Sequence, residues 1–346
     1  MARCAVVAAF LAAATVSAQP QDHFAAAGAE SRLELGRLAL ENGELENAQR
    51  LLREAVQLLK IDKGLRTQAQ LDPLRQLMWA EMRAAQWSEL ETSLEHFYWL
   101  LGQIQDSTLS SQLAIIRDLR QLNLEAAAHP NNPAPAKHFS GAQRLNWQAL
   151  SFIEATVGSD SPRLVPWLYD GVLLQHLENR LNDRRGLSNY QYKTNGSEIV
   201  SGWSLTRNEI NRANYAIGTD LLDRIEAICL AETSRPEHEG LIAATVELYR
   251  GDWALLAGHT EEAVAFYEKA SDQWPGQRPL PATLSNAPYD LAALPRKRFE
   301  LGGPAPELRQ PKPPSDAATG FNGINQTLFA ALGTLEYSAT NPCSTN

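Results

Sequence analysis

The chain of 346 residues has only three cysteines, and this scarcity excludes two classes of protein. A small domain held together by several disulfides needs more cysteines than this, and so does a structural zinc site built on cysteine clusters. The sequence permits one disulfide at most.

The chain also lacks an excess of positive charge and lacks a long apolar run. Lys and Arg total 31 against 40 Asp and Glu, so the formal net charge is −9. An acidic chain repels phosphate backbones and anionic lipids, so we expect no nucleic-acid partner. The apolar stretch 5–16 is shorter than the ~20 residues that a membrane-spanning helix needs, and no later stretch is apolar enough. We therefore expect no membrane span and a soluble mature chain.

The N-terminus has the three parts of an export signal. Arg3 supplies the positive charge, residues 5–16 form the apolar core, and Val16-Ser17-Ala18 offers the small residues that a signal peptidase requires. We interpret residues 1–18 as a signal peptide cleaved after Ala18, which places the mature protein in the periplasm or outside the cell. The alternative is an apolar N-terminal helix that packs on the domain.

Removal of the signal peptide takes Cys4 with it and leaves two cysteines, Cys229 and Cys343. An exported protein meets oxidising conditions, so one interpretation is a Cys229–Cys343 disulfide. Such a bridge closes a loop for which the chain-entropy model gives about 4.7 kcal/mol of stabilisation. In the other interpretation, Cys229 is a small buried apolar residue and Cys343 is a free thiol.

Proline is unevenly placed, since ten of the 19 prolines lie between Pro275 and Pro314. Helix interiors exclude proline, so we expect a helical body over residues 27–275 and a mostly irregular, proline-rich tail over 276–346. Within the body, apolar residues recur three and four positions apart, as on one face of an α-helix, for example over 48–59 and 210–228. Alternation typical of β-strands is nearly absent. The predicted fold class is all-α.

Several short motifs predict where helices begin. Ser31–Glu34, Ser88–Glu91 and Thr206–Glu209 have the spacing of capping boxes. Asp72-Pro73 and Ser161-Pro162 place a capping side chain before a proline at the first helical position.

Two segments of the body share one spacing of small and large residues. The first set is Gly36, Gly43, Ala48, Leu52 and Ala55, and the second is Gly251, Gly258, Ala263, Tyr267 and Ala270, with Pro275 following. The first glycine of each set lets a neighbouring helix approach, and the second accepts the positive φ of a tight turn. The alanines keep the second helix close to the first, and the large residue between them fills the shared core.

These residues resemble the tetratricopeptide repeat (TPR), a helix-turn-helix unit of 34 residues. The match is best over 32–60 and 247–275. Leu71–Gly102 is a degenerate unit, with Met78 and Ala85 in place of the two glycines, while 146–180 and 208–232 match loosely. The resemblance implies antiparallel helix pairs stacked in a solenoid whose concave surface binds a protein or peptide.

Five residues are candidates for that partner-binding surface. In solenoids of this family the first helix of each pair lines the concave side, and the first helices here carry Arg37, Glu41, Arg75, Trp79 and Arg83 away from the packing residues. The alternative is a solvated face with an internal Glu–Arg pair worth ~0.3 kcal/mol. We expect Trp79, Trp87 and Trp99 to belong to the core more than to a stacking surface.

Catalytic motifs are missing from the sequence. It has no nucleophile elbow, no phosphate-binding loop and no zinc-protease pattern, so we expect no catalytic residues, no metal and no cofactor. The favoured function is a non-enzymatic scaffold in the cell envelope that binds a protein or peptide. One alternative is an envelope-assembly subunit that binds through its proline-rich tail in a polyproline II conformation. Another is an exported enzyme with an unrecognised site in 190–203 or in the tail.

Overall fold

A computed structural model of the chain describes residues 20–103, 108–185, 207–233, 236–273, 299 and 343. The interpreted signal peptide 1–18, the segment 190–203, Pro275 and all of the tail except two residues lie outside the described residues.

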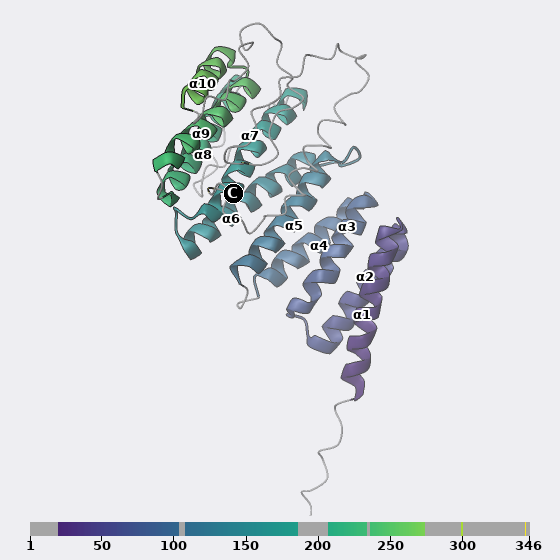
Figure 1. Ribbon diagram of the computed structural model, residues 1–346. Helices are drawn as coiled ribbons and strands as arrows, with labels where there is room; N and C mark the ends of the chain where they lie inside the picture. Colours follow the sequence, from purple (N-terminus) through teal and green to yellow (C-terminus); the bar gives the residue numbers. More distant parts are fainter. Residues whose placement is uncertain are drawn as a thin grey trace, which may run out of the picture. The chain divides into compact units, whose positions relative to one another are not determined.

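The described part of the chain consists of helices and short connections, with no β-strand, which confirms the all-α prediction (Figure 1). The α-helices are α1 Pro20–Glu41, α2 Leu45–Lys63, α3 Leu71–Arg83, α4 Trp87–Leu101, α5 Leu109–Ala128, α6 Pro135–Val157, α7 Val165–Arg185, α8 Arg207–Glu232, α9 Pro236–Leu256 and α10 Thr260–Gln273. Two 3₁₀ turns, η1 Gln68–Gln70 and η2 Pro162–Leu164, precede α3 and α7.

The helices divide into two compact units, with unit 1 ending at Ser107 and unit 2 beginning at Thr108. In unit 1, α1 packs along α2, α2 against α3, and α3 against α4. In unit 2, the pairs α5–α6, α7–α8 and α9–α10 pack side by side, and successive pairs meet through α6–α7 and α8–α9. Each unit is therefore a stack of adjacent antiparallel helix pairs, as in TPR-like repeats.

The first glycine of each matched set lies where the two helices of a pair touch. A Cβ atom added to Gly36 would lie 2.7 Å from Cγ of Leu52, and one added to Gly251 would lie 2.5 Å from the ring of Tyr267. Both large side chains are buried, and so are the alanines beside them, which are Ala48, Ala55, Ala263 and Ala270. The same two positions thus form a close contact between the helices of the first and the last helix pair.

The second glycine of each set ends the first helix of the pair. Gly43 and Gly258 have φ angles of +77° and +85°. Around each of them the backbone N–H of the following residue donates to the carbonyl five residues earlier, at 2.8 Å for Glu44 and 2.9 Å for His259. This hydrogen bond, from an N–H to the carbonyl five positions earlier, ends the helix and lets the chain reverse direction.

The α3–α4 pair makes the same turn without a glycine. Ala85 has a φ of +54° and is the one non-glycine residue with positive φ in the described part of the chain. The N–H of Gln86 donates to the carbonyl of Glu81 at 2.9 Å, which repeats the bond made by Glu44 and His259. An L-residue with a Cβ atom is strained in this left-handed conformation.

Replacing Ala85 with glycine should therefore stabilise unit 1, by about 0.5–1 kcal/mol after the greater flexibility of the unfolded chain is counted. Urea denaturation followed by circular dichroism measures the change. Ala84→Gly is the matched control, since Ala84 has a φ of −81° and an ordinary turn conformation. A loss of stability in Ala85→Gly equal to that in Ala84→Gly would contradict the inferred strain.

Three of the predicted helix starts are wrong. Ser31 lies inside α1, which already begins at Pro20, and Ser88 is the second residue of α4, whose preceding residue Gln86 makes no side-chain cap bond. Asp72 lies inside α3, one residue after its start at Leu71. Ser161 does cap η2, because its hydroxyl accepts a bond from the N–H of Arg163 at 3.4 Å. A side chain caps a helix only where its own residue has non-helical φ and ψ angles, and the motif alone does not show that.

The two loosely matching segments are not helix pairs. Residues 146–180 run from the middle of α6 into α7, and 208–232 lie within the single helix α8. The pairs in this region are α5–α6 and α7–α8. The connection from α5 to α6 contains no glycine between His129 and Ala134, so the glycine spacing gives no sign of it.

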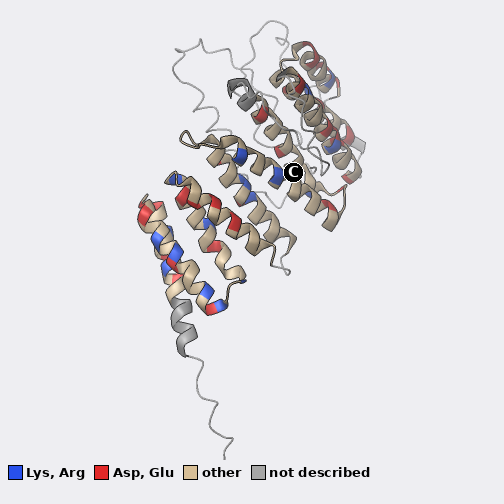
Figure 2. Ribbon diagram, turned by 180° about the vertical axis from the view of Figure 1, so that it is seen from behind, with Lys and Arg blue, Asp and Glu red and all other residues tan. Residues whose placement is uncertain are grey.

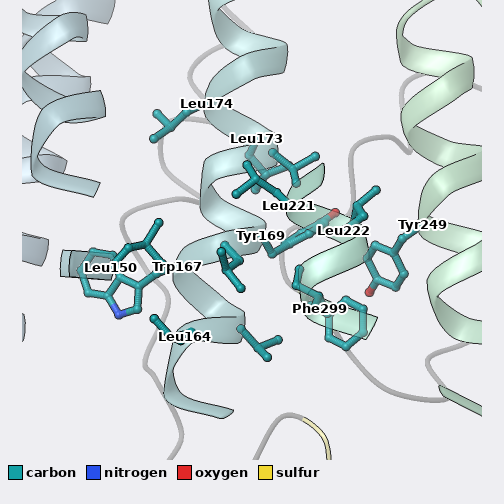
Figure 3. Packing of buried hydrophobic residues seen from close by; sticks show 14 of the residues in the cluster. Leu150, Leu164, Trp167, Tyr169, Leu173, Leu174, Leu221, Leu222, Tyr249 and Phe299 are labelled. Carbon is teal, nitrogen blue, oxygen red and sulfur yellow. The ribbon is translucent and has the colours of Figure 1, made fainter. Parts of the chain in front are cut away.

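Two residues of the proline-rich segment belong to the main core of unit 2. Phe299 and Cys343 are buried in the cluster that surrounds α7, together with residues of α6, α8 and α9. Figure 3 shows Phe299 beside Tyr249 in this cluster. Cys343 forms a disulfide with Cys229 of α8, with a Cα–Cα distance of 5.0 Å. Of the two interpretations of these cysteines, the structure has the bridge.

Candidate functional site

The five candidate surface residues lie on the first helices of the two pairs of unit 1. Arg37 and Glu41 are on α1, and Arg75, Trp79 and Arg83 are on α3. Arg83 and Glu41 are exposed, while Arg37, Arg75 and Trp79 are partly buried. Figure 2 shows that basic and acidic residues are interspersed along the helices of this unit. We name these five residues the α1–α3 face.

Asp72 joins the two helices of the α1–α3 face. Its carboxylate accepts bonds from Arg37 of α1 and, at 2.8 Å, from Arg75 of α3. These side chains are each more than one-third exposed, so each pair contributes no more than about 1 kcal/mol. The pairing nevertheless fixes where both guanidinium groups lie. The sequence motif suggested only a cap for Asp72, since its partner on α1 is 35 residues away.

The solvated-face alternative includes an internal Glu–Arg pair, and such a pair forms within α1, with Glu34 as the partner of Arg37. The nearest acidic groups to Arg37 are Asp72 and Glu34, the latter at 3.7 Å. Glutamate favours a position N-terminal to its basic partner on a helix, and Glu34 satisfies this while Glu41 does not. Glu41 is exposed at the C-terminal end of α1.

Trp79 and Arg83 form a cation–π contact, with the guanidinium carbon 5.9 Å from the ring centroid. Contacts of this kind at partly exposed sites contribute about 0.5–1 kcal/mol. The expectation that Trp99 belongs to the core is wrong, since its side chain is 44% exposed. The buried face of α4 is formed by Leu90, Leu94, Phe97 and Leu100, and Trp99 lies off that stripe.

Unit 2 contains a buried ion pair that the sequence did not indicate. Arg120 of α5 and Asp170 of α7 are both 1% exposed and lie 2.5 Å apart. Arg120 also donates to the side-chain carbonyl of Asn146 on α6 at 2.6 Å, and its guanidinium lies 4.6 Å from the Trp167 ring centroid. These contacts join three helices inside the core, where solvent does not reach them.

Glu178 is a second buried acid in this unit. Burial raises the pKa of its carboxyl, and the bonds from Gln143 and Asn214 lower the pKa by less. The Gln143 bond spans α6 and α7 at 2.7 Å. Glu178 therefore behaves as a satisfied structural group between helices.

Arg250 of α9 binds three carboxylates in an open cavity of about 470 Å³ on α8, α9 and α10. The partners are Asp223 at 2.5 Å, Glu226 at 2.7 Å and Glu247 at 2.8 Å. Lys269 of α10 also binds Glu247 at 2.5 Å. The opposite charges offset one another, so this network ties the last three helices together.

The described residues contain no group of three or more histidine, cysteine, aspartate or glutamate side chains arranged to hold a metal ion. Among the helices that the structure describes, none combines the length and apolar character that crossing a lipid bilayer requires.

Comparison with known proteins found similarity to solved structures. Neither a family model nor a curated protein matches the chain. Among solved structures, the chain is similar to a crystal structure from Podosopora anserina, described as a kinesin light chain with nearly identical TPR-like repeats. The identity is 18%, the match covers 70% of this chain and 93% of that chain, and the TM-score is 0.39. The helix pairs and shared turns described above define this chain as an all-α protein built of adjacent antiparallel helix pairs.

Proposed function

We propose that the protein is a non-enzymatic scaffold that binds another protein or peptide through the α1–α3 face of unit 1. The observation that carries the proposal is the Arg37–Asp72–Arg75 bridge, which holds two arginines on adjacent first helices. Their side chains, with Trp79 and Arg83, remain accessible on a surface that the core does not use.

Repeat proteins of this architecture have extended surfaces made of successive helices, and these surfaces suit the binding of an extended segment. A surface that combines fixed arginines, a tryptophan and exposed Glu41 offers charge-assisted bonds and aromatic contact together. Arginine and tryptophan are the residues most enriched where binding free energy concentrates. These features favour a protein or peptide partner over a small substrate.

Removing the charges of Arg37, Arg75 and Arg83 together, as Gln variants, should reduce capture of the partner from the native cell fraction at least about tenfold. The control variant changes Arg32, Arg50 and Arg66 to Gln, which alters net charge equally elsewhere in unit 1. Affinity capture with mass-spectrometric identification measures recovery of each protein. Both variants should remain folded and lose no more than about 1 kcal/mol for each broken contact, because these contacts are at least one-third exposed. Equal recovery by both variants would show that the α1–α3 face is a solvated surface that does not bind the partner.

We also propose that this function is exercised after export, in the periplasm or outside the cell. The support is the N-terminal pattern ending at Ala18, together with a disulfide that oxidising conditions favour. The intact mass of native protein should correspond to a chain beginning at Gln19. It should also be lower by two hydrogens than the mass after reduction. A mass that includes Met1, with two thiols alkylated without reduction, is the opposite outcome.

A further inference from the structure

The C-terminal end of α2 carries the two most exposed large apolar side chains in the described part of the chain. Ile61 is 78% exposed and Leu65 is 65% exposed, whereas no other large apolar side chain there exceeds 47%. Ile61 lies in the last turn of α2, and Leu65 follows the helix in the short connection to η1. Exposed apolar residues scattered singly are common, but these two are four positions apart at one end of one helix.

Packing within unit 1 does not account for an isoleucine at position 61. The buried stripe of α2 ends at Leu59, which is 7% exposed. Successive residues of an α-helix are about 100° apart, so Ile61 lies about 200° around the helix from Leu59. Ile61 is therefore directed away from the core that α2 helps to form.

The connection that carries Leu65 has a well-defined backbone. The side chain of Gln70 is fully buried, and its Nε2 donates to the carbonyl of Gly64 at 3.0 Å and to that of Leu65 at 3.1 Å. At the start of η1, the hydroxyl of Thr67 accepts a bond from the N–H of Ala69 at 3.3 Å. These bonds fix the turn that holds Leu65 at the surface.

Basic residues flank the two apolar side chains. Lys60 precedes Ile61, Lys63 ends α2, and Arg66 follows Leu65. Lys63 and Arg66 are exposed, and Lys60 is partly buried. Among the residues that the structure describes, none is an ion-pair partner of these three basic side chains. We name Lys60, Ile61, Lys63, Leu65 and Arg66 the α2–η1 patch.

The segment 60–66 is basic although the whole chain is acidic. It contains three basic residues and one acidic residue, the partly buried Asp62, so its formal charge is 3 − 1 = +2, against −9 for the whole chain. Exposed charges are screened over about 8 Å at physiological ionic strength. A charged surface in contact with this segment therefore interacts mainly with the local positive charge.

We propose that the α2–η1 patch binds the surface of an anionic phospholipid bilayer. Ile61 and Leu65 insert among the headgroups, and the three basic side chains bind lipid phosphates. Segments that attach to a bilayer without spanning it combine these two features, inserted apolar side chains and attraction to anionic lipids. The inference goes beyond the proposed scaffold function, because the patch shares no residue with the α1–α3 face.

The composition of the α2–η1 patch favours a bilayer over a protein partner. Protein interfaces are depleted in lysine, and their binding free energy concentrates at tryptophan, tyrosine and arginine. The patch has no aromatic residue, and two of its three basic residues are lysines. A headgroup layer also accommodates protruding aliphatic side chains without a preformed cavity, which a folded protein must supply.

Vesicle flotation of the full disulfide-bonded chain tests the proposal. Vesicles with about 30% phosphatidylglycerol in phosphatidylcholine should bind the chain at least about tenfold more tightly than phosphatidylcholine alone, since each basic residue near an anionic surface contributes about fivefold. Raising NaCl from about 0.1 M to about 0.5 M should remove most of this difference.

Two variants test the two components of the patch. Replacing Lys60, Lys63 and Arg66 with glutamine should abolish the preference for anionic vesicles. Replacing Ile61 and Leu65 with serine should weaken binding to anionic vesicles at least about tenfold, because the apolar insertion is lost. Both variants should remain folded by circular dichroism, since the apolar side chains lie outside the core and the basic ones form no ion pair with described residues.

Two matched controls lie in the same unit. Replacing Leu35 and Leu38 of α1 with serine removes the next most exposed apolar side chains, at 45% and 47%. The glutamine variant of Arg37, Arg75 and Arg83 removes as many positive charges as the basic variant of the patch. Both controls should bind anionic vesicles within about twofold of wild type.

Absence of binding to anionic vesicles, equal binding to both kinds of vesicle, or unchanged binding by either patch variant would overturn the inference. Loss of a captured protein in the patch variants, with vesicle binding unchanged, would show instead that the patch binds a protein. The two proposals fail separately: the patch variants should capture the partner of the α1–α3 face as wild type does, and the arginine variant that loses this partner should still bind vesicles.

Discussion

Replacing Asp170 with alanine should lower the free energy of unfolding of unit 2 by about 3–5 kcal/mol. The change leaves the guanidinium of Arg120 buried at 1% exposure without its carboxylate. Asn146 and the Trp167 ring remain as its neighbours, but neither carries a negative charge. Urea denaturation followed by circular dichroism measures the loss.

Two further variants separate the cost of an unpaired charge from general damage to the core. Glu154→Ala breaks a partly exposed pair with Arg224 in the same unit and should cost less than about 1 kcal/mol. The double variant Arg120→Leu with Asp170→Leu replaces both charges with apolar groups and should cost less than Asp170→Ala alone. A double variant as unstable as the single one would show that the ion pair itself contributes most of the stability.

Replacing Ala263 with glutamate should destabilise unit 2 by about 3–5 kcal/mol. Ala263 is fully buried in α10, in a cluster with Ala254 and Leu255 of α9 and with Tyr267 of α10. A glutamate there must place four additional heavy atoms, three of which form a carboxyl group, between two helices in close contact. The melting temperature and the urea midpoint should both fall.

Ala265→Glu is the matched control, because residue 265 is exposed on the same helix. The two variants have the same composition and net charge, so differences in solubility or unfolded-state charge cancel. Ala265→Glu should stay within about 0.5 kcal/mol of wild type. Equal stability of the two variants would mean that α10 packs on α9 with a different face.

The features that were predicted correctly from the sequence depend on contacts between residues that lie close together in the chain. The spacing of Gly36 and Leu52, or of Gly251 and Tyr267, reflects contacts within one helix pair, where partners are close in the chain and the turn sets their register. The turn at Ala85 follows the same geometry without the glycine, so Leu71–Gly102 was recognisable from its apolar pattern. The connection from α5 to α6 contains no glycine, so the glycine spacing did not show the boundaries of these helices.

By itself, the sequence determined the all-α class, the apolar faces of the helices and the first and last helix pairs, because periodicity and turn residues act over a few positions. Only the tertiary structure decided that Asp72 joins Arg37 to Arg75, that Arg120 meets Asp170 inside the core, and that Phe299 packs beside Tyr169 and Tyr249. These partners come from different helices or from a distant segment. The periodicity of apolar residues in the sequence shows which face of its helix a residue occupies. Which side chain it contacts there depends on how the other helices pack.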